Sequence, residues 1–150
     1  MTSTEIIEAV RVSRFFAAPR DQVFRAWIVA EEFKDWWKAG NYHTSDVELD
    51  ARVGGKYRVA MKAPDGKVQF LFGRYLEISP PERLVMTWAL QGSPSDDGYE
   101  AILTIDFITK GEGTEILLLH ENLQKTSLRN FEAGWQTVLD QFAHYLDRGK

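Results

Sequence analysis

The chain has 150 residues, of which 44% are hydrophobic and 13% are aromatic, and its formal net charge at pH 7 is -4. This length and apolar content favour a single domain that spans residues 1–150. Because the chain is acidic and lacks a run of Lys or Arg, its field repels phosphate groups, and we expect no nucleic-acid partner. The absence of Cys excludes disulfides and thiolate chemistry and fits a reducing compartment.

Signals for export and for membrane insertion are missing from the sequence. The N-terminal residues MTSTEIIEAV lack a basic leader followed by an apolar run. No apolar stretch approaches the roughly 18 residues that a membrane span requires. We therefore expect a cytoplasmic protein that does not contact membranes.

The first half of the chain predicts one strand, two short helices and then a run of strands. β-Branched and aromatic residues that partly alternate predict the first strand over residues 6–17, which Pro19 ends. Apolar stripes predict the helices over residues 19–28 and 31–37. Turn-forming residues separate the next strands, expected at residues 47–55, 56–61, 68–78 and 83–90. We interpret Gly54-Gly55 as a turn or bulge.

The second half predicts a hairpin and a long helix. Residues 99–110 and 115–123 alternate between apolar and polar side chains, and GEGT joins them. Apolar residues spaced by three and four predict one helix over residues 127–145. Gly134 should cost this helix about 1 kcal/mol relative to Ala, so we expect another element to pack closely there. The element order indicates an α+β fold, with the helix laid across an antiparallel sheet.

Several segments, in this order, resemble a known family: RFFAAPRDQVFRAW, the Trp36-Trp37 pair, VELDARVGGKYR, YLEISPPERLVMTW, GTEILLLH and Gly134-Trp135. They are similar to bacterial proteins related to the C-terminal domain of the activator of heat-shock-protein-90 ATPase, in the START-like or SRPBCC superfamily. The resemblance implies a helix-grip fold, in which a curved antiparallel sheet and two short helices enclose a hydrophobic cavity with the long C-terminal helix. It implies no shared catalytic residues. Lys38-Ala39-Gly40 stands where the family commonly has Gly-Pro.

Candidate ligand-binding residues have apolar or aromatic side chains, or a single polar group, on faces that we expect to point inward. They are Trp36, Trp37, Tyr57, Met61, Met86, Trp88, Leu118, His120, Phe131, Trp135 and Val138. A few polar groups in an apolar lining suit a small-molecule pocket, and Arg74 is a further candidate for such a group. The same set also suits an ordinary core.

The orientation of two pairs of apolar residues, Trp36-Trp37 and Leu117 with Leu119, bears on the cavity and on a partner. Adjacent helical residues point about 100° apart, so we expect one of Trp36 and Trp37 to pack in the core and the other to border the cavity mouth. Alternatively, both rings fill the gap between the helices and the sheet. Leu117 and Leu119 should face outward, which suggests cover by another element or a homodimer.

Strand alternation places Ile116, Leu118 and His120 on one inward face. An imidazole there could donate a hydrogen bond to a ligand or act as a base, or it could simply be paired with a backbone carbonyl. His43, His120 and His144 lack the spacing of a metal motif, and Asp96-Asp97-Gly98 is too short for a calcium loop. We expect no metal and no cofactor.

Three functional hypotheses follow. The first is the binding of a small hydrophobic or aromatic molecule in the cavity, mainly through apolar burial. The second, which the resemblance implies, is a co-chaperone-like domain that contacts a chaperone ATPase. The third is a cavity enzyme with His120 as acid or base, which we rank last because no nucleophile, base and orienting residue occur together, and we assign no catalytic residue.

Overall fold

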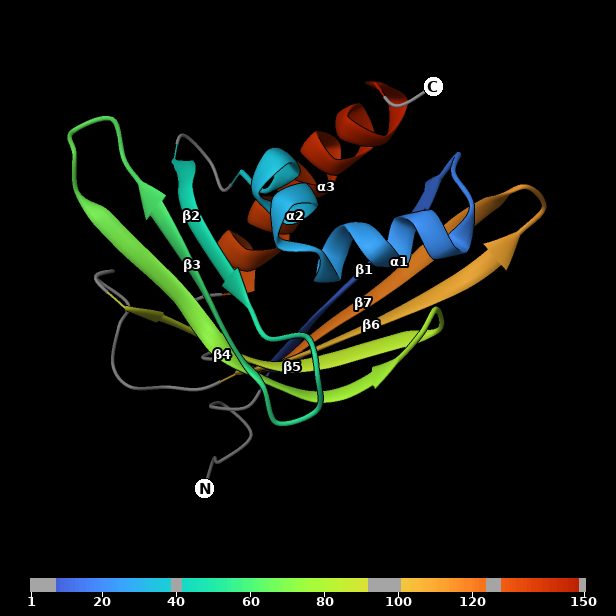
Figure 1. Cartoon of the computed structure of the whole chain (residues 1–150), viewed down its shortest axis with the longest axis horizontal. Coiled ribbons are helices and arrows are strands. Elements are labelled where there is room, and N and C mark those ends of the chain that lie inside the picture. Colours follow the sequence, from blue (N-terminus) through green and yellow to red (C-terminus); the bar gives the residue numbers. More distant parts are fainter. Residues whose placement is uncertain (1–7, 39–41, 92–100, 124–127, 149–150) are drawn as a thin grey trace.

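A curved antiparallel sheet holds the helices in its hollow (Figure 1). The computed structural model describes residues 8–38, 42–91, 101–123 and 128–148. Within them the chain forms a seven-stranded sheet in the order β1-β7-β6-β5-β4-β3-β2 and three helices on its concave side. The elements in chain order are β1 (Glu8–Phe16), α1 (Arg20–Ile28), α2 (Ala30–Trp36), β2 (His43–Leu49), β3 (Lys56–Lys62), β4 (Val68–Ser79), β5 (Arg83–Gln91), β6 (Ala101–Lys110), β7 (Gly113–Leu123) and α3 (Leu128–Arg148). The expected α+β architecture is confirmed.

Side-chain alternation fixes which face of the sheet is buried. β6 alternates strictly between buried and half-buried residues from Ala101 to Ile108. One inner row crosses five strands by backbone pairing and consists of Tyr75, Met86, Leu103, His120 and Val10. All five side chains are buried, so the inward orientation that we expected for His120 is confirmed.

β2 differs from the expectation. It runs from His43 to Leu49, whereas the sequence favoured a strand over residues 47–55. The residues after Leu49 form a turn in which Gly54 has a φ of 85°, a conformation that suits glycine. At Gly55, an added Cβ would lie 2.1 Å from the carbonyl oxygen of Asp50. The strand is an edge strand with few apolar residues, which explains why its polar first half was missed.

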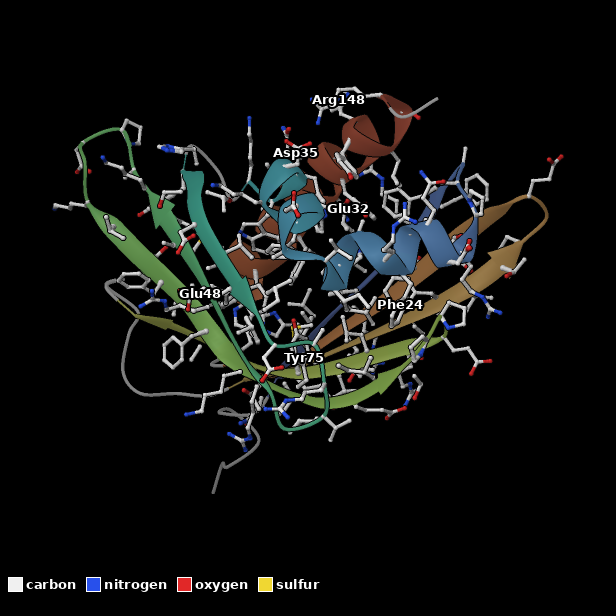
Figure 2. The ribbon with its side chains drawn as sticks, viewed as in Figure 1. Phe24, Glu32, Asp35, Glu48, Tyr75 and Arg148 are labelled. Carbon is white, nitrogen blue, oxygen red and sulfur yellow. The ribbon has the colours of Figure 1, made fainter. Side chains whose placement is uncertain are left out.

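The three described helices cover the concave face of the sheet (Figure 1). α3 packs against β1, α2 packs against β2, and α1 packs against β6 and β7. Phe24 of α1 meets Phe107 of β6 with ring centroids 5.0 Å apart, and Phe16 of β1 meets Phe142 of α3 at 5.1 Å. Figure 2 shows Phe24 between α1 and the sheet and Tyr75 in the trough of the sheet. The interior therefore lies between the concave face and all three helices.

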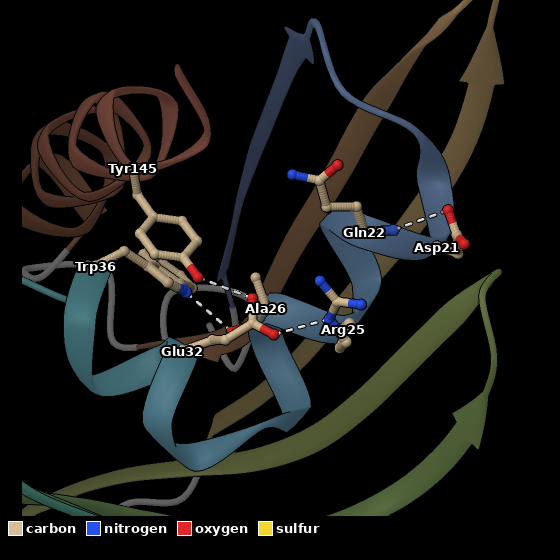
Figure 3. A network of polar contacts seen from close by, with 7 residues as sticks. All are labelled: Asp21, Gln22, Arg25, Ala26, Glu32, Trp36 and Tyr145. Carbon is tan, nitrogen blue, oxygen red and sulfur yellow. Dashed lines mark hydrogen bonds and ion pairs between the residues drawn. The ribbon is translucent and has the colours of Figure 1, made fainter. Parts of the chain in front are cut away.

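Glu32 on α2 joins the helices to one another (Figure 3). Its two carboxylate oxygens accept hydrogen bonds from Arg25 Nε on α1 and from the Tyr145 hydroxyl on α3, each at 2.8 Å. Burial, with the hydrogen bond to Glu32, raises the pKa of Tyr145 to about 12, so its phenol is neutral at pH 7.

Among the described helices, none combines the length and the apolarity needed to cross a bilayer.

The expected close contact at Gly134 is wrong. Gly134 is exposed on α3, and apart from its chain neighbours and the adjoining helix backbone no heavy atom of the described residues lies within 4 Å of the position that a Cβ would take. Trp135, one residue later, is buried. A step of one residue turns a helix by about 100°, so the glycine faces solvent while its neighbour faces the core.

Candidate functional site

An aromatic cluster fills the space between the concave face of the sheet and the helices. All five tryptophans belong to it, and each is buried: Trp27, Trp36, Trp37, Trp88 and Trp135. Their rings meet mainly edge to face or tilted, with centroids 4.8 to 6.4 Å apart. Such geometry is favourable for aromatic rings and stabilises the cluster beyond simple area burial.

Trp36 and Trp37 are both buried, which contradicts the expectation that one of them borders the cavity mouth. α2 ends at Trp36, and Trp37 already has an extended backbone with φ -73° and ψ 117°. The 100° rule for adjacent helical residues therefore does not apply to this pair. The indole of Trp36 donates a hydrogen bond to the carbonyl of Ala26 at 2.9 Å. The ring of Trp37 instead turns toward the sheet and stacks on Phe33 at 5.1 Å.

A small cavity of about 10 Å³ lies beside Trp37. Its lining is entirely apolar or aromatic apart from two phenols and the indole nitrogens, and consists of Trp27, Phe33, Trp37, Leu49, Tyr57, Leu71, Tyr75, Met86 and Trp88. This volume is close to the minimum for one water molecule. Burial raises the pKa of Tyr75, with a further contribution from Asp50, so this lining phenol is neutral.

The phenol of Tyr57, which we expected as an inward polar group, and the indole of Trp37 both make hydrogen bonds within the protein. The Tyr57 hydroxyl donates to the backbone carbonyl of Thr87 at 2.5 Å, which ties β3 to β5 across β4. The Trp37 indole donates to Met61 Sδ at 3.3 Å. Arg74, considered as a further inward polar group, is exposed instead. Leu71 and Tyr75 occupy the inner face of β4 and are both buried, so alternation turns Arg74 outward.

His120 lies at the end of the apolar row on β7 and is fully buried. Its Nδ1 accepts a hydrogen bond from the Trp135 indole at 3.0 Å. Its ring also meets Phe131 and Trp88 nearly edge to face, with centroids 4.9 and 5.1 Å apart. Burial lowers the pKa of His120 to about 3, because the cationic form loses its hydration in this aromatic surrounding.

The hydrogen bond from Trp135 fixes the tautomer of His120. An indole nitrogen only donates, so Nδ1 must carry the lone pair and the single proton of the neutral ring must sit on Nε2. Among the described residues, this Nε2–H has no hydrogen-bond partner. The alternative that the imidazole is simply paired with a backbone carbonyl is therefore wrong for Nε2 within the described residues.

Two further buried nitrogens also lack a hydrogen-bond partner among the described residues. The indole nitrogens of Trp27 and Trp88 lack partners within the described part of the chain. Both residues line the small cavity. Folded proteins leave few buried donors unpaired, and each one costs about 1–3 kcal/mol. Three such donors around one aromatic interior are the unusual feature of this site.

The structure brings together most of the candidate residues. Trp37, Tyr57, Met86 and Trp88 line the cavity, while Met61, His120, Phe131 and Trp135 join the same interior through the contacts above. Seven candidates are not among the cavity-lining residues, and none of the lining residues belongs to α3. The seven are Trp36, Met61, Leu118, His120, Phe131, Trp135 and Val138. Of these, Trp36 packs against Phe142 of α3, with ring centroids 4.4 Å apart.

Sequence reasoning missed five lining residues, namely Trp27, Phe33, Leu49, Leu71 and Tyr75. Alternation along β4 identifies Leu71 and Tyr75 as inward, and the apolar stripes of the short helices include Trp27 and Phe33. Leu49 ends β2, whose weak pattern gave no such signal.

The outer face of the sheet carries apolar side chains as expected. Leu117 is 39% exposed and Leu119 is half-buried. A homodimer through this face stays a prediction. Among the described residues, no three His, Asp or Glu side chains are grouped as a metal site. Asp96-Asp97-Gly98 lies outside the described residues.

Known proteins share this architecture. An X-ray structure of a protein from Chromobacterium violaceum is 29% identical, with a TM-score of 0.81 over 91% of this chain and 94% of that one. A solution structure of an AHSA1-like protein from Aeromonas hydrophila is 23% identical, with a TM-score of 0.77 over 95% and 94% of the two chains, and shows the same fold.

The sequence is also similar to that of a human protein and matches a known family. The human "Activator of 90 kDa heat shock protein ATPase homolog 1" is 28% identical over 88 residues, which cover 59% of this chain and 23% of the human protein. The match thus spans about a quarter of that protein's length. Residues 17–147 match the family described as "Activator of Hsp90 ATPase homolog 1-like protein". The chain therefore belongs to the family of activator of Hsp90 ATPase homolog 1-like proteins.

Proposed function

We propose that this protein binds a small hydrophobic or aromatic molecule in the interior between the concave face of the sheet and α3. The observation that carries the proposal is a group of buried nitrogens on Trp27, Trp88 and His120 that have no hydrogen-bond partner among the described residues. A ligand with an acceptor atom would satisfy at least one of these donors while its apolar part buries area against the rings. Apolar burial contributes about 25 cal/mol per Å², so a bicyclic ligand gains several kcal/mol.

The space for such a molecule must come from movement of side chains, because the cavity holds about 10 Å³. Met86 lines the cavity, and an unbranched thioether can change rotamer at low cost. Trp37 stands on extended backbone just after α2, and its indole is held by a sulfur acceptor rather than by an oxygen. Sulfur is a weak acceptor, so this indole can leave Met61 with a small loss of free energy.

The geometry of His120 argues against the hypothesis of a cavity enzyme. A base must offer a lone pair, but Trp135 occupies the lone pair on Nδ1 and the proton occupies Nε2. With its pKa lowered to about 3 by burial, the imidazole is neutral at pH 7 and has no additional proton to give up as an imidazolium acid. His120 is suited to donate a hydrogen bond, which is a binding role.

A role as an ATPase activator stays a prediction for this chain. The human relative carries that function in its name, but the matched region is 23% of its length. The exposed Leu117 on the outer face gives a chaperone partner a possible contact. The interior donors, by contrast, have no use in such a contact, and they favour the binding of a small molecule.

The test is titration of the protein with N-phenyl-1-naphthylamine, a neutral aromatic probe that fluoresces in apolar sites. We expect saturable fluorescence enhancement, quenching of tryptophan emission and a raised melting temperature. A ligand at 100 times its dissociation constant adds about 2.7 kcal/mol of apparent stability. Absence of all three effects in the folded wild type would contradict the proposed function.

Matched variants show where the probe binds. Trp37→Leu enlarges the cavity that this ring lines and should change the affinity for the probe at least several-fold. Phe15→Leu also replaces an aromatic ring with Leu, but in a side chain that is 56% exposed, and should leave the affinity unchanged. Equal effects of the two substitutions would place the probe on the outer surface.

A further inference from the structure

We propose that the ligand carries a neutral acceptor oxygen, such as a ketone, aldehyde or ester carbonyl, and that the Nε2–H of His120 is its hydrogen-bond donor. This inference rests on the proposed function and adds the chemical class of the ligand. The donor is fully buried, has no partner among the described residues and cannot change tautomer while Trp135 holds Nδ1 at 3.0 Å. Trp135 is therefore a positioning residue that decides which edge of the imidazole faces the ligand.

Trp88 carries a second buried donor on a ring that contacts His120. Its ring centroid lies 5.1 Å from that of His120, its side chain is 8% exposed and its indole N–H lacks a partner within the described residues. Ala101 is the residue opposite Trp88 on β6. A carbonyl oxygen has two lone pairs and suits two donors of this kind.

The same surroundings disfavour an anionic ligand. Within the described residues, the buried polar or charged side chains are Thr87, Thr114 and His120, and none of them is a fixed cation. Protonation of His120 would require Nδ1 to release the Trp135 hydrogen bond, since both ring nitrogens of the cation donate. A carboxylate in this interior would remain without a counter-charge, which costs far more than burial of a neutral carbonyl.

The experiment compares probes that differ at one atom. 2-Acetylnaphthalene carries a carbonyl, whereas 2-isopropenylnaphthalene has nearly the same shape with CH₂ in place of oxygen, and 2-naphthoate carries a charge. We expect the ketone to bind about 10-fold more tightly than the alkene, because the alkene leaves the buried donors unpaired. The naphthoate should bind more weakly than both neutral probes.

The outcomes separate this inference from the proposed function. Binding of neither neutral probe would contradict the proposed function and the inference with it. Equal affinity for ketone and alkene would leave the proposed function standing and overturn the inference. Tighter binding of the naphthoate would also overturn it, because it would reveal a cationic site.

Two variants assign the preference to its residues. His120→Phe keeps a ring but removes the donor, and the ketone should lose its advantage over the alkene. Trp135→Phe keeps the wall of the interior but frees Nδ1, and the advantage should shrink as the second tautomer becomes populated. Tyr145→Phe is the control, because it also removes a ring hydrogen-bond donor from α3 but acts on Glu32 instead of His120. An unchanged preference in the first two variants would overturn the inference.

Nitrogen NMR of the wild-type imidazole tests the tautomer without any ligand. We expect the proton of His120 on Nε2 in wild type and a mixed population in Trp135→Phe, and this shift would not follow from a purely structural role of Trp135. Addition of 2-acetylnaphthalene should move the Nε2–H and Trp88 indole signals downfield. A wild-type proton on Nδ1 would overturn the proposal even if the variants fail to fold.

Discussion

Acidification should destabilise this protein through one buried imidazole. In the unfolded chain, His120 takes up a proton below its ordinary pKa of about 6.5. In the folded chain, burial lowers the pKa of His120 to about 3. Protons therefore bind the unfolded state preferentially between these values, so the contribution to stability is complete above about pH 6.5 and is lost as the pH falls toward 3.

The size of the loss follows from the same two pKa values. Between pH 7 and pH 5 the unfolded imidazole goes from mostly neutral to almost fully protonated, while His120 in the folded state stays neutral. At 1.36 kcal/mol per pH unit, this range removes about 2 kcal/mol from the free energy of unfolding. Any folded pKa below about 4 gives nearly the same figure at pH 5, so the prediction depends little on its exact value.

Urea denaturation at pH 7 and pH 5 measures this loss. His120→Gln is the reference variant, because its amide can accept the hydrogen bond from Trp135 but does not titrate. The pH-dependent loss should be about 2 kcal/mol smaller in the variant than in wild type. His43 and His144 are exposed and remain in both proteins, so their contribution cancels. Equal pH dependence in the two proteins, or an imidazole that titrates near pH 6 in the folded wild type by NMR, would refute the reasoning.

Three further substitutions test the packing described above by urea denaturation. Gly134→Ala should stabilise the protein by up to about 1 kcal/mol, because the added Cβ meets open space on a helix, and any destabilisation would contradict the exposed placement. Gly73→Ala should destabilise it by several times that amount, because the Cβ would lie 2.3 Å from the carbonyl oxygen of Thr87; a neutral result would be inconsistent with this contact. Tyr145→Phe should cost about 1 kcal/mol through loss of the hydrogen bond to Glu32, and a cost above about 3 kcal/mol would show that the bond does more than join α2 to α3.

The fold was largely predictable because local patterns determine it. Alternation with period two placed Ile116, Leu118 and His120 on the inner face, and the three-four spacing predicted the long helix. These patterns depend on residues close in the sequence, so no tertiary information was needed. The edge strand β2 was placed less well, because it is half-exposed and its apolar signal is weak.

Two predictions from the sequence, for Trp37 and for Gly134, were wrong because they depend on geometry that the spacing of apolar residues does not determine. Trp37 points into the core because α2 ends one residue earlier, and helix ends are uncertain by one or two residues from sequence. The sequence predicted a close neighbour at Gly134, but the glycine is exposed, and an exposed glycine in a helix only costs stability. A sequence contains no signal that separates these two explanations for a helical glycine.

The chemistry of His120 could not be predicted from sequence at all. Its tautomer depends on a hydrogen bond from Trp135, which lies 15 residues away on a different element. Its neutral state depends on rings contributed by β5 and α3. Only the assembled interior shows that the imidazole presents a donor, and not a base, to whatever it contacts.

The central claim is that a small neutral aromatic molecule enters the interior between the sheet and α3. Intermolecular nuclear Overhauser effects between 2-acetylnaphthalene and the labelled protein test it most directly. We expect contacts from the probe to the Met86 methyl group and to the rings of Trp88 and Trp135. Contacts confined to the exposed side chains of Leu117 or Phe72 on the outer face, or no contacts at saturating probe, would contradict it.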